Sequence, residues 1–314
     1  MAPNDIIVVG GSAGALPILQ RIVKDFPDNF PAAIFVVLHL SPDAPSHLGE
    51  IVNRAGSLYA DFAKNDEQIV ASRIYIAPPD RHLVISDGKV QLTRDARENR
   101  SRPAIDVLFR SAARSRGHRV IAVLLSGLYD DGVQGLQVVS RKRGKVIVVK
   151  PDDTEFPQMP ENAIRYDHPD YVLSVSDIAP KIRELIANAE NHDDDPKSED
   201  ESEAYSVASG YICPDCGGPL YEDEKAEFPH FRCHVGHAYS LSALLAGADD
   251  ALESALWAAI RCLKENAELK ERTAAMFVRN GQTENAARLR EDAKAQQQQV
   301  KLLQERTLAV QRRP

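Results

Sequence analysis

The chain has 314 residues, of which 43% are hydrophobic, so it is long enough for one large domain with a smaller one, and its composition argues against global disorder. Its formal net charge of −8 argues against a generic nucleic-acid-binding protein. Because no apolar run approaches the roughly 18 residues that span a bilayer, and because the N-terminus lacks a basic flank and a cleavage pattern, we expect a soluble, cytoplasmic protein.

Residues 1–189 alternate strand-like and helix-like segments. The strand-like segments are continuous apolar runs rich in β-branched residues, which indicates a sheet buried on both faces by helices. They occupy residues 5–10, 32–39, 73–78, 119–127 and 145–150, and helical patterns occupy residues 16–26, 46–55 and 104–117. We therefore predict an α/β domain with a doubly wound, mostly parallel, Rossmann-like sheet. Residues 82–93 differ, because two short runs around Asp87-Gly88 predict a β-hairpin.

Three shorter regions follow this domain. Residues 190–208 are acidic and almost free of large apolar side chains, which predicts a flexible, solvated linker. Residues 209–240 form a compact segment that contains three of the cysteines. Residues 241–314 carry two apolar stripes at helical spacing, and the sequence RNGQ at 279–282 is typical of a helix stop. We expect a helical hairpin there, as a possible region for homo-oligomerisation or partner binding.

The first strand runs into the sequence GGSAG at residues 10–14, which satisfies the G-x-S-x-G pattern of a nucleophilic serine on a strand-to-helix turn. Such a serine needs neighbours without side chains, and the helix N-terminus beneath it favours a developing oxyanion. The segment also approaches the dinucleotide-binding fingerprint, but that pattern requires glycines where this chain has Ser12 and Ala15. By itself the motif leaves three interpretations open: a nucleophile, a phosphate-binding loop and a plain tight turn.

Two other strand ends offer the base and the acid that a nucleophilic serine needs. The second strand ends in His39, and a later strand leads into Asp130-Asp131. Because the carboxyl ends of parallel strands lie at one edge of a sheet, these side chains and Ser12 are expected at the same edge. The agreement of the three strand ends favours a serine hydrolase over a dinucleotide-binding protein.

Several segments resemble the catalytic domain of the chemotaxis receptor methylesterases, the CheB family. They are the GGSAG turn, the strand-end histidine with Pro42 three residues further on, and the sequence SGLYDDG at 126–132. The sequences IYIAPPDRHL at 74–83, RPAIDVLF at 102–109 and QMPENAI at 158–164 also resemble family segments. Together these pieces cover about residues 5–185 in the family's order, and their combination is specific although no single piece is.

The resemblance implies a reaction and the residues that perform it. Ser12 would be the nucleophile and His39 the general base. Asp131, rather than Asp130, would orient the histidine. The backbone N–H groups that would hold the oxyanion are those of Ala13 and Leu128. The implied reaction is hydrolysis of γ-glutamyl methyl esters on methylated helices of chemoreceptors or related signalling proteins, with release of methanol, no cofactor for catalysis, and glutamine deamidation as a side activity.

The chain also departs from the family pattern. Family members typically carry an N-terminal receiver domain, whereas this sequence begins at the catalytic strand, so we expect a stand-alone form without that switch. Tyr129 stands where glycine is common in the family, which could narrow the cleft or change the substrate. The alternative to an active esterase is therefore a catalytically reduced interaction or regulatory module that binds a signalling partner through its C-terminal regions.

The segment at 209–240 contains C-x2-C, sixteen further residues and C-x3-H. Three thiolates and one imidazole suit tetrahedral zinc, and disulfides are disfavoured in the cytosol. The predicted ligands, with His237 preferred to His234, are Cys213, Cys216, Cys233 and His237. Four protein ligands would close the site, which makes the zinc structural, and a zinc-ribbon-like module this short needs its metal to fold. A degenerate site without metal and a redox-active cysteine pair are the alternatives, and the segment resembles tails found on stand-alone CheB-like proteins.

Overall fold

The computed structural model describes residues 5–39, 46–188, 205–223 and 228–310. The chain divides into two compact units, residues 1–244 and 245–314. Within the described ranges, no helix is both long enough and apolar enough to cross a membrane. Pro42 and most of the predicted linker, residues 190–204, lie outside the described residues.

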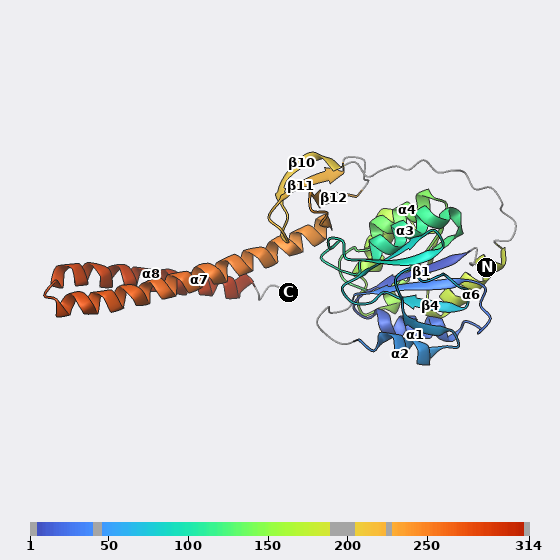
Figure 1. The fold of residues 1–314 in the computed structure, drawn as a ribbon, viewed down its shortest axis with the longest axis horizontal. Coiled ribbons are helices and arrows are strands. Elements are labelled where there is room, and N and C mark those ends of the chain that lie inside the picture. Colours follow the sequence, from blue (N-terminus) through green and yellow to red (C-terminus); the bar gives the residue numbers. More distant parts are fainter. Residues whose placement is uncertain (1–4, 40–45, 189–204, 224–227, 311–314) are drawn as a thin grey trace. The chain divides into compact units, whose positions relative to one another are not determined.

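A seven-stranded sheet forms the centre of the first unit (Figure 1). Its strand order is β3-β4-β2-β1-β7-β8-β9, and every neighbouring pair is parallel. The strands are β1 (Ile6–Gly11), β2 (Ala33–Leu38), β3 (Tyr59–Phe62), β4 (Arg73–Ile76), β7 (Val120–Leu124), β8 (Lys145–Val149) and β9 (Tyr171–Leu173). The chain winds from β1 toward β3 and β4, then crosses to β7 and continues toward β9, so the switch point of the sheet lies between β1 and β7. The doubly wound parallel class predicted from the sequence is confirmed.

Helices cover both faces of this sheet, because successive strand residues alternate between two hydrophobic cores. On β1, Ile7 and Val9 belong to one core and Ile6 and Val8 to the other. The first core takes α1 (Ala15–Lys24), α2 (Leu48–Ala55) and α6 (Val175–Asn188), and the second takes α3 (Ile105–Arg116), α4 (Val133–Arg141) and α5 (Gln158–Asp167). Figure 1 shows α1 and α2 on one side of the sheet and α3 and α4 on the other. Short 3-10 turns occupy Gly117–Arg119 and Pro151–Asp153.

Strands β5 (His82–Ser86) and β6 (Lys89–Thr93) form the hairpin that the sequence predicted. Asp87 and Gly88 connect them with φ angles of 50° and 74°, the two left-handed residues of a type I′ turn. Leu83 and Val90 of the hairpin join the core that contains α3. The hairpin therefore covers part of α3, the helix whose N-terminus faces the candidate site described below.

The first unit also contains a four-stranded antiparallel sheet, in the order β10-β11-β12-β13. Its strands are β10 (Tyr205–Ile212), β11 (Pro219–Asp223), β12 (His230–Cys233) and β13 (Ala238–Ser240). We call residues 205–240 the cysteine module. The module begins at Tyr205, which pairs with Asp223 across the sheet, so residues 205–208 are part of a strand and not of the predicted linker. The linker was predicted from composition, which does not reveal pairing with a distant strand.

The second unit is a pair of helices. Helix α7 (Leu241–Arg279) begins in the first unit, and α8 (Thr283–Val310) follows a turn in which Gly281 has a φ of 75°, at the predicted helix stop. The buried side chains of this unit recur at every seventh residue: Ile260, Ala267 and Ala274 on α7, and Ala286, Ala293 and Val300 on α8. This is the heptad spacing of a coiled-coil seam, and the small alanines let the two helices approach closely.

Candidate active site and metal centre

Ser12 lies in the turn between β1 and α1, at the carboxyl edge of the parallel sheet. Its N–H donates to the carbonyl of Ser126 at 2.7 Å, and its carbonyl accepts the N–H of Ala15 at 3.1 Å. Ser126 follows β7, the strand that pairs with β1. The serine backbone is therefore fixed both to its own helix and to the neighbouring strand end.

The glycines around this turn have separate functions. A Cβ atom at Gly10 would lie 2.2 Å from Ile105 Cγ2, so this glycine is needed for the packing of α3 on β1. The glycine that leaves room at the serine itself is Gly127, where an added Cβ would lie 2.9 Å from Ser12 Cβ. The expected clearance around Ser12 thus comes partly from a neighbouring strand end rather than only from the motif.

His39 and Asp131 contact each other directly. His39 Nε2 lies 2.7 Å from Asp131 Oδ2, and the side chain of Asp131 is only 3% exposed. The His39 N–H donates to the carbonyl of Gly11 at 3.2 Å, and the parallel register pairs Gly11 with Leu38. Ser12 and His39 therefore follow a paired position at the ends of adjacent strands. No hydrogen bond between Ser12 Oγ and His39 occurs in the described structure, and this contact is often long in the absence of substrate.

Asp131 is held by the N-terminus of α3. Its Oδ2 also accepts the Ile105 N–H at 2.8 Å, and its Oδ1 accepts the Asp106 N–H at 3.2 Å and Asn99 Nδ2 at 3.0 Å. Burial raises the pKa of Asp131, but the hydrogen bonds that it accepts, first of all from His39, outweigh burial and hold the pKa below its ordinary value. The carboxylate is therefore ionised where it meets His39, as an orienting anion must be.

The adjacent Asp130 has different partners. Its two carboxylate oxygens accept the hydroxyl groups of Ser240 and Ser242, each at 2.5 Å. Burial raises the pKa of Asp130, in contrast to the lowered pKa of Asp131. The structure therefore places Asp131, and not Asp130, against His39.

Two buried polar residues that the sequence did not single out lie behind Asp131. Asn99 Nδ2 donates to Asp106 Oδ2 at 2.8 Å in addition to its bond with Asp131. Asp106 Oδ1 accepts the N–H of Gly135 at 2.6 Å, and burial together with the charge of Asp131 raises the pKa of Asp106 well above its ordinary value. Asp106 belongs to the RPAIDVLF segment, which could have marked it, whereas Asn99 lies in a loop that carries no recognisable pattern.

Ala13 and Leu128 each present a backbone N–H that has no hydrogen-bond partner among the described residues. The N–H groups of Gly127 and Tyr129, on either side of Leu128, are both occupied. Leu128 directly follows Gly127, where an added Cβ would lie 2.9 Å from Ser12 Cβ. Two unoccupied N–H groups beside a serine suit an oxyanion site.

Tyr129 adopts a φ of 61°, a backbone conformation that glycine favours. This agrees with the glycine expected from the resemblance at this position. Two side chains of helix α5 bind the backbone of Tyr129. The Tyr129 N–H donates to Gln158 Oε1 at 3.0 Å, and the Tyr129 carbonyl accepts a hydrogen bond from Asn162 Nδ2 at 2.8 Å. Tyr129 is 43% exposed.

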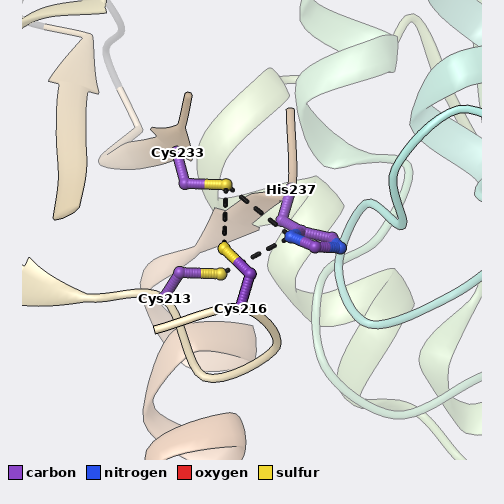
Figure 2. Close-up of side chains that lie close together, drawn as sticks. All are labelled: Cys213, Cys216, Cys233 and His237. Atoms are coloured by element: carbon purple, nitrogen blue, oxygen red, sulfur yellow. Dashed lines mark hydrogen bonds between the residues drawn. The ribbon is translucent and has the colours of Figure 1, made fainter. Parts of the chain in front are cut away.

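Four side chains of the cysteine module converge, and Figure 2 shows their sulfur and nitrogen atoms facing one another. Their potential ligand atoms all lie within 4.8 Å of one another: Cys213, Cys216, Cys233 and His237. The Sγ atoms of Cys216 and Cys233 are 3.7 Å apart, and His237 Nδ1 lies 3.6 Å from Sγ of both Cys213 and Cys233. A tetrahedron around zinc, with bonds of about 2.3 Å to sulfur and about 2.0 Å to nitrogen, has edges of roughly 3.5–3.8 Å. His234, the other histidine considered, instead lies 3.0 Å from a tyrosine hydroxyl on β11.

Comparisons with known proteins agree with this geometry. The CheB methylesterase family matches residues 7–182. A putative protein-glutamate methylesterase/protein-glutamine glutaminase from Leptospira interrogans is 34% identical over 185 residues, which is 59% of this chain and 96% of that protein. A protein-glutamate methylesterase/protein-glutamine glutaminase from Thermotoga maritima is also 34% identical over 185 residues, which is 58% of this chain but 54% of that protein.

A solved structure resembles the same part of the chain. The crystal structure of the Thermotoga maritima CheB methylesterase catalytic domain matches with a TM-score of 0.56 and 34% identity, covering 58% of this chain and 98% of that domain. The family match ends at residue 182, before the cysteine module and the helical unit. With more than half of its length matched and the serine turn, the histidine and the aspartate at one sheet edge, the chain belongs to the CheB methylesterase family.

Proposed function

We propose that the protein is a serine hydrolase that demethylates glutamate γ-methyl esters on chemoreceptor-like proteins, with deamidation of protein glutamine as a second reaction. The relatives described above are named for both reactions. The observation that carries the proposal is the 2.7 Å contact between His39 Nε2 and Asp131 Oδ2 beside the Ser12 turn. The substrate would be a methylated receptor helix, which presents its ester on the surface, where an open site at a sheet edge can reach it.

In the proposed mechanism, Ser12 Oγ attacks the ester carbonyl carbon while His39 takes the hydroxyl proton. The accepting nitrogen is Nδ1, because Nε2 faces Asp131. Asp131 keeps the ring oriented and stabilises the imidazolium. The N–H groups of Ala13 and Leu128 donate to the oxyanion of the tetrahedral intermediate.

The intermediate then collapses to an acyl-enzyme. The bond between the carbonyl carbon and the methoxy oxygen breaks, and methanol leaves with the proton that His39 held. Water attacks the acyl carbon with His39 again as the base, which frees the glutamate side chain and restores the Ser12 hydroxyl. With a glutamine substrate, ammonia leaves in place of methanol.

Methanol release from a methylated receptor fraction tests the proposal. Ser12→Ala should release methanol about 10³-fold more slowly than wild type, or slower still, because the nucleophile is lost. Ser57→Ala, which makes the same change at an exposed serine, should retain the wild-type rate. Equal release by wild type and Ser12→Ala would show that the nucleophile is assigned wrongly and would favour the catalytically reduced interaction module.

We also propose that the cysteine module binds one structural zinc ion through Cys213, Cys216, Cys233 and His237. Three of the distances between ligand atoms, at 3.6–3.7 Å, match the edges of a zinc tetrahedron and support this site, and four protein ligands leave no open position for a substrate. The module has a small core of its own, which supports its dependence on metal. None of the four cysteines forms a disulfide, which suits the cytoplasmic location that we propose.

Elemental analysis of the purified protein tests the metal proposal. We expect about one zinc ion per chain in wild type, because four thiolate and imidazole ligands bind zinc tightly. His237→Ala should lose the zinc, whereas His234→Ala should keep it, since that side chain faces a tyrosine hydroxyl. Equal zinc contents in the two histidine variants would contradict the ligand set.

We further propose that the helical unit associates with a second copy of the chain or with a signalling partner. Its support is the set of large apolar side chains that stay exposed among the described residues of this unit: Leu245 (63%), Leu252 (57%), Trp257 (39%), Leu269 (62%), Met276 (46%), Val278 (43%) and Leu302 (54%). Apolar side chains gathered on a narrow pair of helices are typical of an interaction surface.

A further inference from the structure

Strand β13 of the cysteine module is hydrogen-bonded to the loop that carries Asn99. The Ala238 N–H donates to the carbonyl of Arg97 at 3.2 Å, and the Ala238 carbonyl accepts the Asn99 N–H at 2.8 Å. The side-chain oxygen of Asn99 accepts the N–H of Ser240 at 2.8 Å. Loop and strand thus pair in parallel, and the pairing includes both the backbone and the side chain of Asn99.

The same side chain reaches the candidate catalytic residues. Asn99 Nδ2 donates to Asp131 Oδ1 at 3.0 Å and to Asp106 Oδ2 at 2.8 Å, and Asp131 lies 2.7 Å from His39. The amide orientation is fixed, because its oxygen meets an N–H of the module while its nitrogen meets two carboxylates. Asn99 is 8% exposed, so the loss of either set of partners would leave a buried polar group unpaired.

A second contact joins the module to the same site. The Ser240 and Ser242 hydroxyl groups donate to Asp130, the residue before Asp131. Asp130 and Asp131 are 3% and 2% exposed. Residues at and just after β13 therefore hold both the asparagine behind Asp131 and the residue that precedes it.

The proposed metal ligands adjoin β13 directly. His237 precedes Ala238, the first residue of the strand, and the His237 carbonyl accepts the N–H of Cys233 at 3.0 Å. Two of the four ligands therefore frame the turn that leads into β13. In a module with so small a core, a bound metal would supply much of the folding free energy, so the order of β13 would depend on it.

We propose that the cysteine module is a support for the catalytic site: its metal orders β13, β13 holds Asn99, and Asn99 is a positioning residue that orients the Asp131 carboxylate against His39. This inference rests on the proposed esterase activity and the proposed zinc site. It makes ester hydrolysis dependent on a metal ion that contacts neither the substrate nor the triad.

Asn99→Gly tests the positioning step. Asn99 has a φ of 48°, which glycine adopts freely, so the variant removes the side chain and keeps the backbone unstrained. Its kcat for methanol release should fall roughly 10–100-fold, with KM within about twofold of wild type, because a displaced base slows the chemistry without removing substrate contacts. Asn280→Gly, the same change in the turn between α7 and α8, should match wild type.

The His39 ring gives a readout that does not depend on turnover. The imidazole proton shared with Asp131 should give a downfield proton NMR signal in wild type and in Asn280→Gly. That signal should shift or disappear in Asn99→Gly and in zinc-stripped full-length protein. If Asn99 only stabilises the fold, folded Asn99→Gly protein would keep the signal and the wild-type kcat, which would overturn the proposal.

Zinc removal tests the coupling to the module. Stripping zinc from the full chain with a chelator should lower kcat to the level of Asn99→Gly, and added zinc should restore it. Stripping Asn99→Gly should change kcat less than about twofold, because both changes break the same connection and are not additive. The coupling would be overturned if zinc-stripped protein kept the wild-type kcat, or if zinc removal lowered the kcat of Asn99→Gly by the same factor as that of wild type. Either result would leave the esterase function intact.

The two proposals fail in different ways. If wild type shows no methanol release that depends on Ser12, the proposed function fails, and the His39 signal alone then decides the coupling. A His39 NMR signal that is unchanged by zinc removal would overturn the coupling between the cysteine module and the catalytic site. If Asn99→Gly does not fold, the zinc-loaded and zinc-stripped wild-type proteins decide between the same outcomes.

Discussion

At the scale of single residues, one ion-pair cluster holds both ends of the loop that carries Asn99. Asp80 accepts hydrogen bonds from Arg94 Nε at 3.0 Å and from Arg102 Nε at 2.9 Å. The hydrogen bonds from Arg94 first, and then from Arg102, lower the pKa of Asp80 from 3.8 to about 2. Because the two arginines flank Asn99 in the chain, this carboxylate restrains the loop behind the candidate triad.

We expect this cluster to stabilise the fold in a pH-dependent manner. The folded-state pKa of Asp80 lies below its ordinary value, so its contribution is fully present above about pH 4 and is lost as the pH falls toward about 2. Asp80→Asn should lower the free energy of unfolding, measured in urea at pH 7, by about 1 kcal/mol or less for a partly exposed cluster. This difference should shrink toward zero as the pH falls through about 2.

Asp87→Asn is the matched control for this measurement. Its position in the hairpin turn has a φ of 50°, which asparagine accommodates well, so its urea midpoint should equal that of wild type at both pH values. A destabilisation by Asp80→Asn that persists undiminished at about pH 2 would contradict the assignment.

At the scale of elements, α3 packs so closely against both β1 and α4 that glycine is required at each contact. A Cβ at Gly10 of β1 would lie 2.2 Å from Ile105 Cγ2, and one at Gly135 of α4 would lie 2.6 Å from Phe109 Cβ. The close approach matters for chemistry as well as for stability, since the N-terminal N–H groups of α3 bind Asp131. Any displacement of α3 would therefore move the carboxylate that orients His39.

Gly10→Ala should destabilise the fold by about 1–3 kcal/mol, because its methyl group overpacks against Ile105. Gly49→Ala on α2 is the control: its added Cβ would meet no atom closer than 3.5 Å, so its stability should equal or slightly exceed that of wild type. Urea unfolding of both variants measures the difference. Wild-type stability in Gly10→Ala would mean that α3 moves away from β1 at little cost.

At the scale of the whole molecule, the two compact units contain different kinds of structure. The first unit joins the parallel sheet and the cysteine module through hydrogen bonds that link Asn99 and Asp130 to Ser240. The second unit is a pair of helices with a heptad seam and with exposed leucines outside that seam. The residues of the proposed chemistry all lie in the first unit, and the surface that we propose for association lies on the second.

We expect the full chain to associate through the second unit. Its mass in solution, measured by light scattering after size exclusion, should be a multiple of 34.6 kDa. The double variant Leu269→Glu, Val278→Glu should shift it toward 34.6 kDa by placing charges on the apolar surface. Val172→Glu on β9, at 42% exposure against 43% for Val278, is the control and should keep the wild-type mass. A monomeric wild type would rule out self-association and leave a signalling partner as the occupant.

Much of the fold and part of the site could be predicted from the sequence. The hairpin at Asp87-Gly88 and the helix stop at Gly281 depend on the conformations of a few adjacent residues, and both occur as expected. Strands β3 and β9 were missed, because four and three residues are too few to establish a periodic pattern. The meeting of His39 and Asp131 followed from one topological rule, that parallel strands end at the same edge.

Short-range patterns were thus sufficient for the longer strands of the parallel sheet, for several helices and for the serine, histidine and aspartate candidates, because the forces that produce such elements act between neighbours in the chain. The partners of the buried carboxylates depended on the tertiary structure. Asp130 binds Ser240, a residue 110 positions away, while Asp131 binds His39, 92 positions away. Asn99 gains its role only because folding brings a loop, a helix N-terminus and strand β13 to one buried point, where each polar group must find a partner.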